Sequence, residues 1–212
     1  MKNTRTNFHV VVVGAGIIGA TIAFYLSRRA IDVTVVDATH VPSGSTSHSF
    51  AWLNAFAKTE PESHFQLNWK SMDMWDRFVR LLDEDVGLRW GGGLTWESTE
   101  EGARRLIETI RILQERGYPA RLIAERELLN LEPELSPGEV TAAAYQETEG
   151  QVDPINVVSA CLMRVASGGG TVRLGNPVLN LIASGNHVNA VQTAEGVISC
   201  DAAVIAAGVD AT

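Results

Sequence analysis

Cysteine is scarce in this chain of 212 residues, which contains only Cys161 and Cys200. Cys161 falls in an apolar, helix-like segment, and Cys200 lies beside a predicted strand. Two such distant residues are more typical of buried free thiols than of a disulfide or a metal-binding pair. The lack of a disulfide framework favours a reducing, cytoplasmic compartment.

Basic residues are also few, since 17 Lys and Arg stand against 25 Asp and Glu, for a formal net charge of −8. This balance disfavours nucleic acid or an anionic membrane as the main partner. Lys2 and Arg5 precede an apolar run, but no small-residue cleavage site follows, so a secretory signal is not expected. The apolar run from His9 to Leu26 contains three glycines and is barely long enough to cross a bilayer, so we expect no transmembrane segment. A hydrophobic content of 45% allows one sizeable core or two small ones.

The most informative stretch is a strand, a glycine-rich turn, a helix and a second strand in succession. Residues 8–13 predict a β-branched strand, residues 20–29 a helix, and residues 32–36 a second strand that ends on Asp37. The turn between the first strand and the helix has the sequence Gly14-Ala15-Gly16-Ile17-Ile18-Gly19. This is the Gly-x-Gly-x-x-Gly fingerprint of dinucleotide-binding βαβ units.

Each part of the fingerprint has a physical role in holding an adenine dinucleotide. Gly14 allows the tight turn, Gly16 lets the backbone approach a pyrophosphate, and Gly19 lets the helix pack closely on the strand. The helix N-terminus favours the pyrophosphate through its free N–H groups and its dipole. Asp37 can accept hydrogen bonds from the adenosine ribose. An ordinary strand-to-helix turn at a sheet edge is the alternative, but the two strands, the helix and the terminal acid together favour the dinucleotide site.

Beyond Asp37 the chain departs from a simple nicotinamide-binding domain. A small polar loop is predicted at residues 41–49 and a long helix from Ser63 to Leu82, with Leu67 among its core residues. Short elements follow up to Tyr145, with strands at 88–90, 93–96 and 140–145, a helix at 100–116 and a shorter helix that ends near Pro133.

The dinucleotide-binding pattern resumes at Asp153. Asp153 is a natural N-cap and Pro154 suits the first helical position, so a helix is predicted from Ile155 to Ser167. The apolar run 202–206 is typical of a buried parallel strand, which ends at Ala207-Gly208. Between them a small meander is predicted, with strands at 172–174, 178–182, 188–192 and 197–199.

Four segments in this order resemble the FAD-dependent D-amino-acid oxidase superfamily, which includes glycine oxidase, sarcosine oxidase, D-amino-acid dehydrogenase and dimethylglycine dehydrogenase. They are the Gly14 fingerprint with its strand-end acid, the Ser/Thr loop at 43–49, the stretch 150–154 and the strand end at 201–208. The resemblance covers nearly the whole chain. It implies an α/β fold, with an FAD-binding Rossmann-like (βαβ) domain, an inserted α+β substrate domain and no C-terminal half. The FAD-binding domain would comprise residues 1–85 and 146–212, and residues 86–145 would begin the substrate domain.

The resemblance also implies which residues hold FAD. The pyrophosphate would lie against residues 14–19, and the ribose against Asp37, with Ala38 beside it; most relatives carry Glu in place of Asp37. The backbone of Val178 would pair with the adenine edge. The flavin side would be wrapped by Gly44, Ser45, Thr46 and Ser47, and the cofactor would pass close to Ala206, Ala207 and Gly208.

His48 ends a segment, Gly44-Ser45-Thr46-Ser47-His48, that is similar to Gly-Ser-Thr-Trp-His in dimethylglycine and sarcosine dehydrogenases. The histidine of that segment is covalently linked to the flavin, and Ser47 is the one departure here. A loop histidine that forms hydrogen bonds near the cofactor is the favoured interpretation. Covalent attachment is the alternative.

The resemblance implies an FAD-dependent oxidoreductase that oxidises the C–N bond of a small-molecule amino acid or secondary amine. The flavin accepts a hydride from the carbon beside the amine, and water hydrolyses the resulting imine. This chemistry demands no triad or metal, and the sequence identifies no catalytic residue and no metal ligand. The Arg and Tyr that bind a substrate carboxylate in relatives lie in the half that this chain lacks. The alternatives are an incomplete, non-catalytic flavin-binding subunit or fragment that needs a partner chain, and an NAD-dependent dehydrogenase, which fits the fingerprint but not the Ser/Thr loop.

Overall fold

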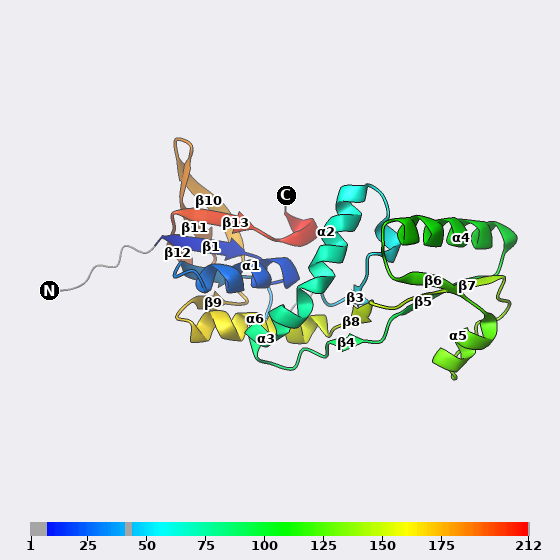
Figure 1. Cartoon of the computed structure of the whole chain (residues 1–212). Helices are drawn as coiled ribbons and strands as arrows, with labels where there is room; N and C mark the ends of the chain where they lie inside the picture. The colour runs from blue at the N-terminus through cyan, green and yellow to red at the C-terminus, as the bar shows by residue number, and fades with distance from the viewer. Residues whose placement is uncertain (1–7, 41–43, 212) are drawn as a thin grey trace. The chain divides into compact units, whose positions relative to one another are not determined.

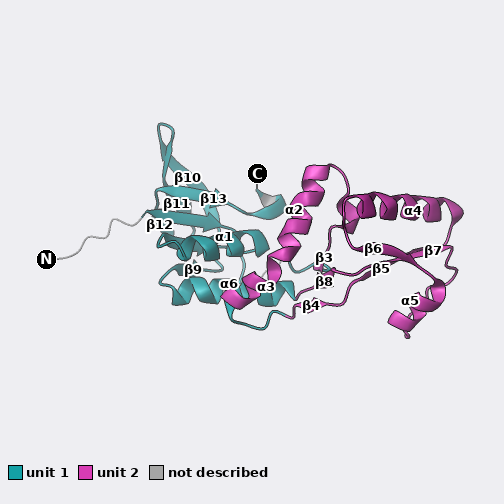
Figure 2. Cartoon of the chain, viewed as in Figure 1, with its two compact units in different colours: residues 1–50, 82–86, 153–212 teal, residues 51–81, 87–152 magenta. Residues whose placement is uncertain are grey.

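The computed structural model describes residues 8–40 and 44–211, without the side chain of Asp210 (Figure 1). Lys2, Arg5 and the first three positions of the predicted polar loop, residues 41–43, lie outside the described residues. The chain forms two compact units (Figure 2). Unit 1 comprises residues 1–50, 82–86 and 153–212, and unit 2 comprises residues 51–81 and 87–152.

These packing boundaries differ from the domain boundaries expected from the sequence. Residues 51–81 and 146–152 were expected with the cofactor domain but pack in unit 2. The reason is a shared core, since Phe65 and Met72 contact the same buried cluster as Leu113 of the charged helix. The assignment of the units to cofactor and substrate stays a prediction.

Unit 1 is built on a parallel sheet whose strands are rich in buried valine. Its strand order is β13-β1-β2-β9, and all three pairings are parallel. Val11 and Val12 are fully buried, as is Val35 in the adjacent strand, because a strand covered on both faces needs apolar side chains on both. The strands are β1 (His9–Val13), β2 (Asp32–Val36), β9 (Thr171–Arg173) and β13 (Ala202–Ile205).

Two helices and a meander cover this sheet (Figure 1). Helices α1 (Ile17–Ser27) and α6 (Pro154–Ser167) pack against each other and against the strands. The antiparallel meander contributes Val191 and Ile198 to a buried cluster with Val11 and Val36 of the sheet. Its strands are β10 (Val178–Ser184), β11 (His187–Thr193) and β12 (Gly196–Ser199).

Three predictions about unit 1 have different outcomes. The side chain of Asp153 caps α6 by accepting from the N–H groups of Ile155 and Asn156 at 2.9 and 3.0 Å. Residues 202–205 form the predicted parallel strand, but Ile205 is 49% exposed because β13 is an edge strand of the described sheet. The predicted meander strand at 172–174 is wrong, because β9 pairs in parallel with β2 after the α6 crossover.

Unit 2 contains two small antiparallel sheets. The sheet β5-β7-β6 is covered by α4, whose N-cap Thr99 accepts from Gly102 N–H at 3.1 Å. The shorter sheet has the order β3-β8-β4. The elements are β3 (Trp52–Leu53), β4 (Arg89–Trp90), β5 (Gly93–Glu97), β6 (Ala120–Ile123), β7 (Ala142–Gln146), β8 (Gly150–Gln151), α4 (Glu100–Glu115), α5 (Glu125–Leu131) and the 3₁₀ turn η1 (Phe56–Lys58).

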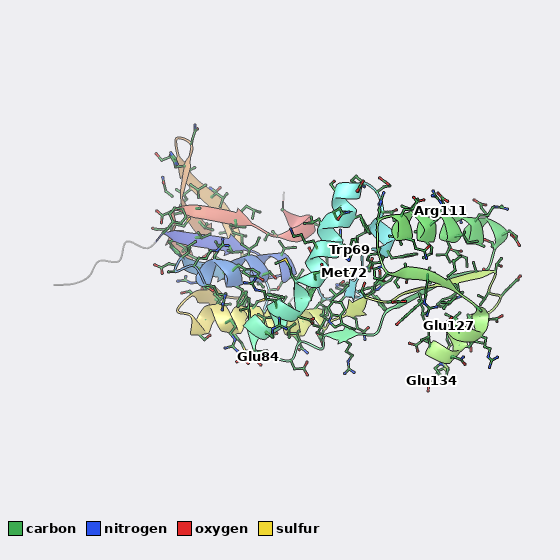
Figure 3. All side chains as sticks on the ribbon, viewed as in Figure 1. Trp69, Met72, Glu84, Arg111, Glu127 and Glu134 are labelled. Carbon is green, nitrogen blue, oxygen red and sulfur yellow. The ribbon has the colours of Figure 1, made fainter. Side chains whose placement is uncertain are left out.

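The long helix predicted from Ser63 to Leu82 is two helices, α2 (Glu62–Asp73) and α3 (Trp75–Leu82). The Ser71 hydroxyl donates to the Leu67 carbonyl at 2.6 Å, and Met74 N–H turns to the Ser71 carbonyl, three residues back. Such hydroxyl-to-backbone bonds often bend helices. Trp69 and Met72 of α2 pack on the core (Figure 3), whereas Leu67, expected in the core, is exposed.

Both cysteines are free and buried, as the sequence predicted. Burial raises the pKa of the Cys161 thiol to about 12 and also raises that of Cys200, which lies beside Asp201. Both thiols are therefore expected to be unreactive.

Candidate cofactor-binding site

The glycine turn between β1 and α1 has the close packing that the fingerprint predicts. Gly14 has a φ of +102° and donates its N–H to the Val36 carbonyl at 2.8 Å. A Cβ on Gly14 would collide with the carbonyl of Ala206, and a Cβ on Gly19 would collide with that of Gly14. Glycine is therefore required at both positions, and the turn lies directly against the end of β13.

The N-terminus of α1 lies inside the fingerprint. The helix begins at Ile17 rather than at Ala20, with Gly16 as its N-cap and no side-chain cap from Gly16 itself. The Ile17 N–H instead donates to Thr46 Oγ1 at 3.0 Å. Thr46 is buried, and its Oγ1 would lie 3.2 Å from a Cβ on Gly16. The structure thus brings the fingerprint and the Ser/Thr loop together.

Asp37, directly after β2, is bonded back to the turn. Its Oδ2 accepts from Ala15 N–H at 2.7 Å, and its Oδ1 accepts from the N–H and the hydroxyl of Thr39, each at 2.8 Å. A carboxylate can accept about four hydrogen bonds. Asp37 therefore stabilises the turn and retains capacity for a further donor, while Ala38 beside it is exposed.

The loop from Gly44 to His48 is a compact turn held by its own polar groups. Ser47 donates its N–H and its hydroxyl to the Gly44 carbonyl at 3.1 and 3.0 Å. His48 Nδ1 lies 3.1 Å from both the Gly44 carbonyl oxygen and Ser47 Oγ. Ser45, Ser47 and His48 are exposed, so their side chains can be reached by a ligand.

The remaining candidate residues lie at the same end of the parallel sheet. Asn176 N–H donates to the Asp37 carbonyl at 2.9 Å, which fastens the segment before Val178 to the end of β2. Ala206 N–H donates to the Val13 carbonyl at 2.7 Å. Ala206 and Ala207 are half-buried, and Gly208 is exposed.

Sequence reasoning missed Thr39 and Asn176. Thr39 had a recognisable signal, since a hydroxyl two residues after an aspartate is typical of a turn closed by the aspartate side chain. Asn176 stands before a proline in a turn-like stretch, but its side chain is fully buried, and its Oδ1 accepts from Glu195 N–H at 3.2 Å. That long-range contact has no local pattern.

Comparison with known proteins identifies the family. Residues 9–212 match the family model of FAD-dependent oxidoreductases, so the chain belongs to that family. It is 28% identical over 207 residues to the glycine oxidase of Geobacillus kaustophilus, which covers 95% of this chain and 54% of that protein.

Solved structures of the family share this fold. The glycine oxidase of Geobacillus kaustophilus superposes with a TM-score of 0.88 at 26% identity, over 97% of this chain and 57% of that one. L-proline dehydrogenase from P. horikoshii gives 0.85 at 25% identity, over 97% and 54%. The glycine oxidase of Bacillus cereus gives 0.89 at 23% identity, over 97% and 56%. The expected family and fold class are confirmed, and the chain spans about half the length of these relatives.

Residues 8–40 and 44–211 contain no helix with the length and apolarity needed to span a bilayer.

Proposed function

We propose that this chain binds FAD and is part of an oxidoreductase that oxidises the C–N bond of an amino acid or secondary amine. The observation that carries the proposal is the hydrogen bond between Ile17 N–H and Thr46 Oγ1, which joins the two cofactor segments at the N-terminus of α1. The family match supports the cofactor. The similarity to a glycine oxidase and to an L-proline dehydrogenase supports the substrate class.

The residues at the start of α1 fit a pyrophosphate. Thr46 Oγ1 accepts from Ile17 N–H, so its own proton is free to be donated to a phosphate oxygen. Gly16 presents bare backbone at this point, and the first N–H groups of a helix have no partner within the helix. The helix dipole adds a favourable field for an anion.

Asp37 would hold the adenosine end of the cofactor. One ribose hydroxyl would donate to a carboxylate oxygen of Asp37, which can accept more hydrogen bonds than it does here. Val178 and Ala38 are proposed to flank the adenine, and residues 206–208 to let the cofactor pass. When bound, the flavin supplies the acceptor for a hydride from the carbon beside the amine.

We propose a non-covalent role for His48 beside the flavin. Its Nδ1 is engaged by the loop, which leaves Nε2 as the ring atom that can bond to the cofactor. Flavin that stays with the protein after acid precipitation, and is released from His48→Ala, would instead demonstrate the covalent link.

The test is FAD titration of the chain with two variants of Thr46. Thr46→Val keeps the shape but loses the hydroxyl, and we expect weaker FAD binding by about 1–3 kcal/mol, since the phosphate loses a hydrogen-bond donor. Thr46→Ser, the matched control, should bind nearly as well as the original chain. Equal affinities for all three, or tight NAD binding without FAD binding, would contradict the proposed site.

A further inference from the structure

Unit 2 contains a buried polar cluster around Glu149, which includes none of the proposed cofactor residues. The side chains of Glu149 and Gln146 are fully buried, and Tyr118 is 2% exposed. Glu149 stands directly before β8, Gln146 ends β7, and Tyr118 follows α4. A fully buried carboxyl group with no cation beside it needs a physical explanation.

The two carboxyl oxygens of Glu149 have different surroundings. Oε1 accepts from the Tyr118 hydroxyl at 2.6 Å and from Phe56 N–H at 3.1 Å. Oε2 has no hydrogen-bond partner, and neither has Oε1 or Nε2 of Gln146. The surroundings of Oε1 therefore suit the carbonyl oxygen of a protonated carboxyl group, which accepts hydrogen bonds, whereas Oε2 accepts none.

Oε2 of Glu149 and Oε1 of Gln146 converge on one point beside Gly93. A Cβ added to Gly93 would lie 2.5 Å from Glu149 Oε2, 3.0 Å from Gln146 Oε1 and 3.1 Å from the Trp52 ring. A turned Gln146 amide would offer Nε2 to Oε2 as a donor, but a carboxylate buried here would still lack a cation to offset its desolvation. A proton on Oε2 removes that charge and can be donated to Gln146 Oε1.

The charged and titratable groups around this cluster do not neutralise Glu149. Lys58 of η1 donates to the Asn54 carbonyl at 3.2 Å, and Arg116 is bound to the Thr59 carbonyl and to Glu60. Helix α2 contributes Met72, whose sulfur lies 4.0 Å from the Tyr118 hydroxyl. No ion pair of Glu149 is found within the described part of the chain. Burial raises the pKa of Glu149 against the opposing effect of its hydrogen bonds, and burial beside Glu149 raises the pKa of Tyr118.

We propose that Glu149 is a neutral carboxylic acid in the folded protein. In this form it connects three segments of unit 2: the backbone at Phe56, the Tyr118 side chain and Gln146 at the end of β7. Loss of this proton at alkaline pH leaves a buried anion and destabilises the packing of these segments. This inference does not depend on the cofactor or on the proposed function.

The direction of the pH effect follows from proton linkage. The folded state keeps the Glu149 proton at pH values where the unfolded chain has lost it, so the stabilisation is complete below the unfolded pKa and is lost as pH rises toward the folded pKa. Glu149→Gln keeps both hydrogen-bonding positions, with an amide in place of the O–H, and does not titrate.

The experiment is denaturant unfolding of the full 212-residue chain and its variants from about pH 6 to about pH 9. Tryptophan fluorescence reports on unit 2 alone, because all five tryptophans lie there, at positions 52, 69, 75, 90 and 96. We expect the unfolding equilibrium constant of the original chain to rise about tenfold per pH unit relative to Glu149→Gln. Glu147→Gln is the matched control, because Glu147 is exposed and pairs with Arg121 at 3.2 Å, so its pH dependence should follow the original chain.

Parallel pH curves for the original chain and Glu149→Gln would overturn the proposal. Infrared spectroscopy of the original chain decides the matter if Glu149→Gln does not fold. A carbonyl band of a protonated carboxyl group at neutral pH is expected, and it should vanish at the alkaline pH at which unit 2 loses stability. Its absence at neutral pH would show that Glu149 is ionised.

Discussion

At the scale of a single residue, Asp37 combines a structural role in the glycine turn with a proposed role in binding the ribose. Its carboxylate holds the glycine turn through Ala15 N–H and closes its own turn through Thr39. The same carboxylate is the proposed acceptor for the ribose.

Asp37→Ala should therefore affect both binding and stability. We expect the variant to lose one to two charge-assisted hydrogen bonds to FAD, which weakens binding by about 1.5–3 kcal/mol for each bond. The FAD-free variant should also melt at a lower temperature, because Ala15 N–H loses its acceptor. Titration by flavin fluorescence and thermal unfolding without FAD measure the two effects. Asp37→Glu is the control, since it restores the carboxylate; unchanged affinity in the alanine variant would mean that the ribose lies elsewhere.

At the scale of elements, the cap of α6 is the feature that the sequence predicted in most detail. Asp153 accepts from two N–H groups at the start of α6, which packs against α1. Asp153→Ala should destabilise the chain by about 1 kcal/mol, because both N–H groups lose their partner. Asp153→Asn should retain most of the stability, since asparagine is also a good N-cap. Urea unfolding followed by circular dichroism tests this, and equal midpoints for all three chains would show that the cap does not stabilise α6.

The elements also show which features local sequence can predict. The glycine turn, β1, β2 and α6 follow from spacing and capping, which act over a few residues. Strand β9 was predicted in the wrong sheet, because a short strand has the same local pattern whether it pairs with β2 or with the meander. The break at Met74 depends on a hydroxyl-to-backbone bond that periodicity does not reveal. The candidate site was predicted at its glycines, Asp37 and Thr46, while Asn176 required the folded chain.

At the scale of the whole molecule, the chain spans about half the length of its relatives. Within the described residues, unit 1 exposes Leu179 by 62%, Val197 by 60% and Val209 by 83%, and β13 is an edge strand. Exposed apolar side chains and unpaired strand edges favour association with another chain. A cytoplasmic location, suggested by the buried thiols, stays a prediction.

We expect residues 1–212 alone to show weak or no turnover of glycine, sarcosine or D-amino acids, even with FAD supplied. The resemblance implies that the substrate carboxylate is bound by residues outside this chain, and misplacement by about 1 Å can cost roughly a hundredfold in rate. A peroxide-coupled or dye-linked assay measures this. Robust turnover by the monomeric chain would show that these outside residues are dispensable.

The central claim is that the fingerprint, Asp37 and the Ser/Thr loop form one site for the adenosine pyrophosphate of FAD. Its most direct test is competition, in which FAD binding to the isolated chain is followed by flavin fluorescence and then challenged with ADP. The claim predicts saturable binding of one FAD per chain and its displacement by ADP, which carries the same adenosine and pyrophosphate groups. Failure to bind FAD, or FAD binding that ADP does not displace, would contradict it.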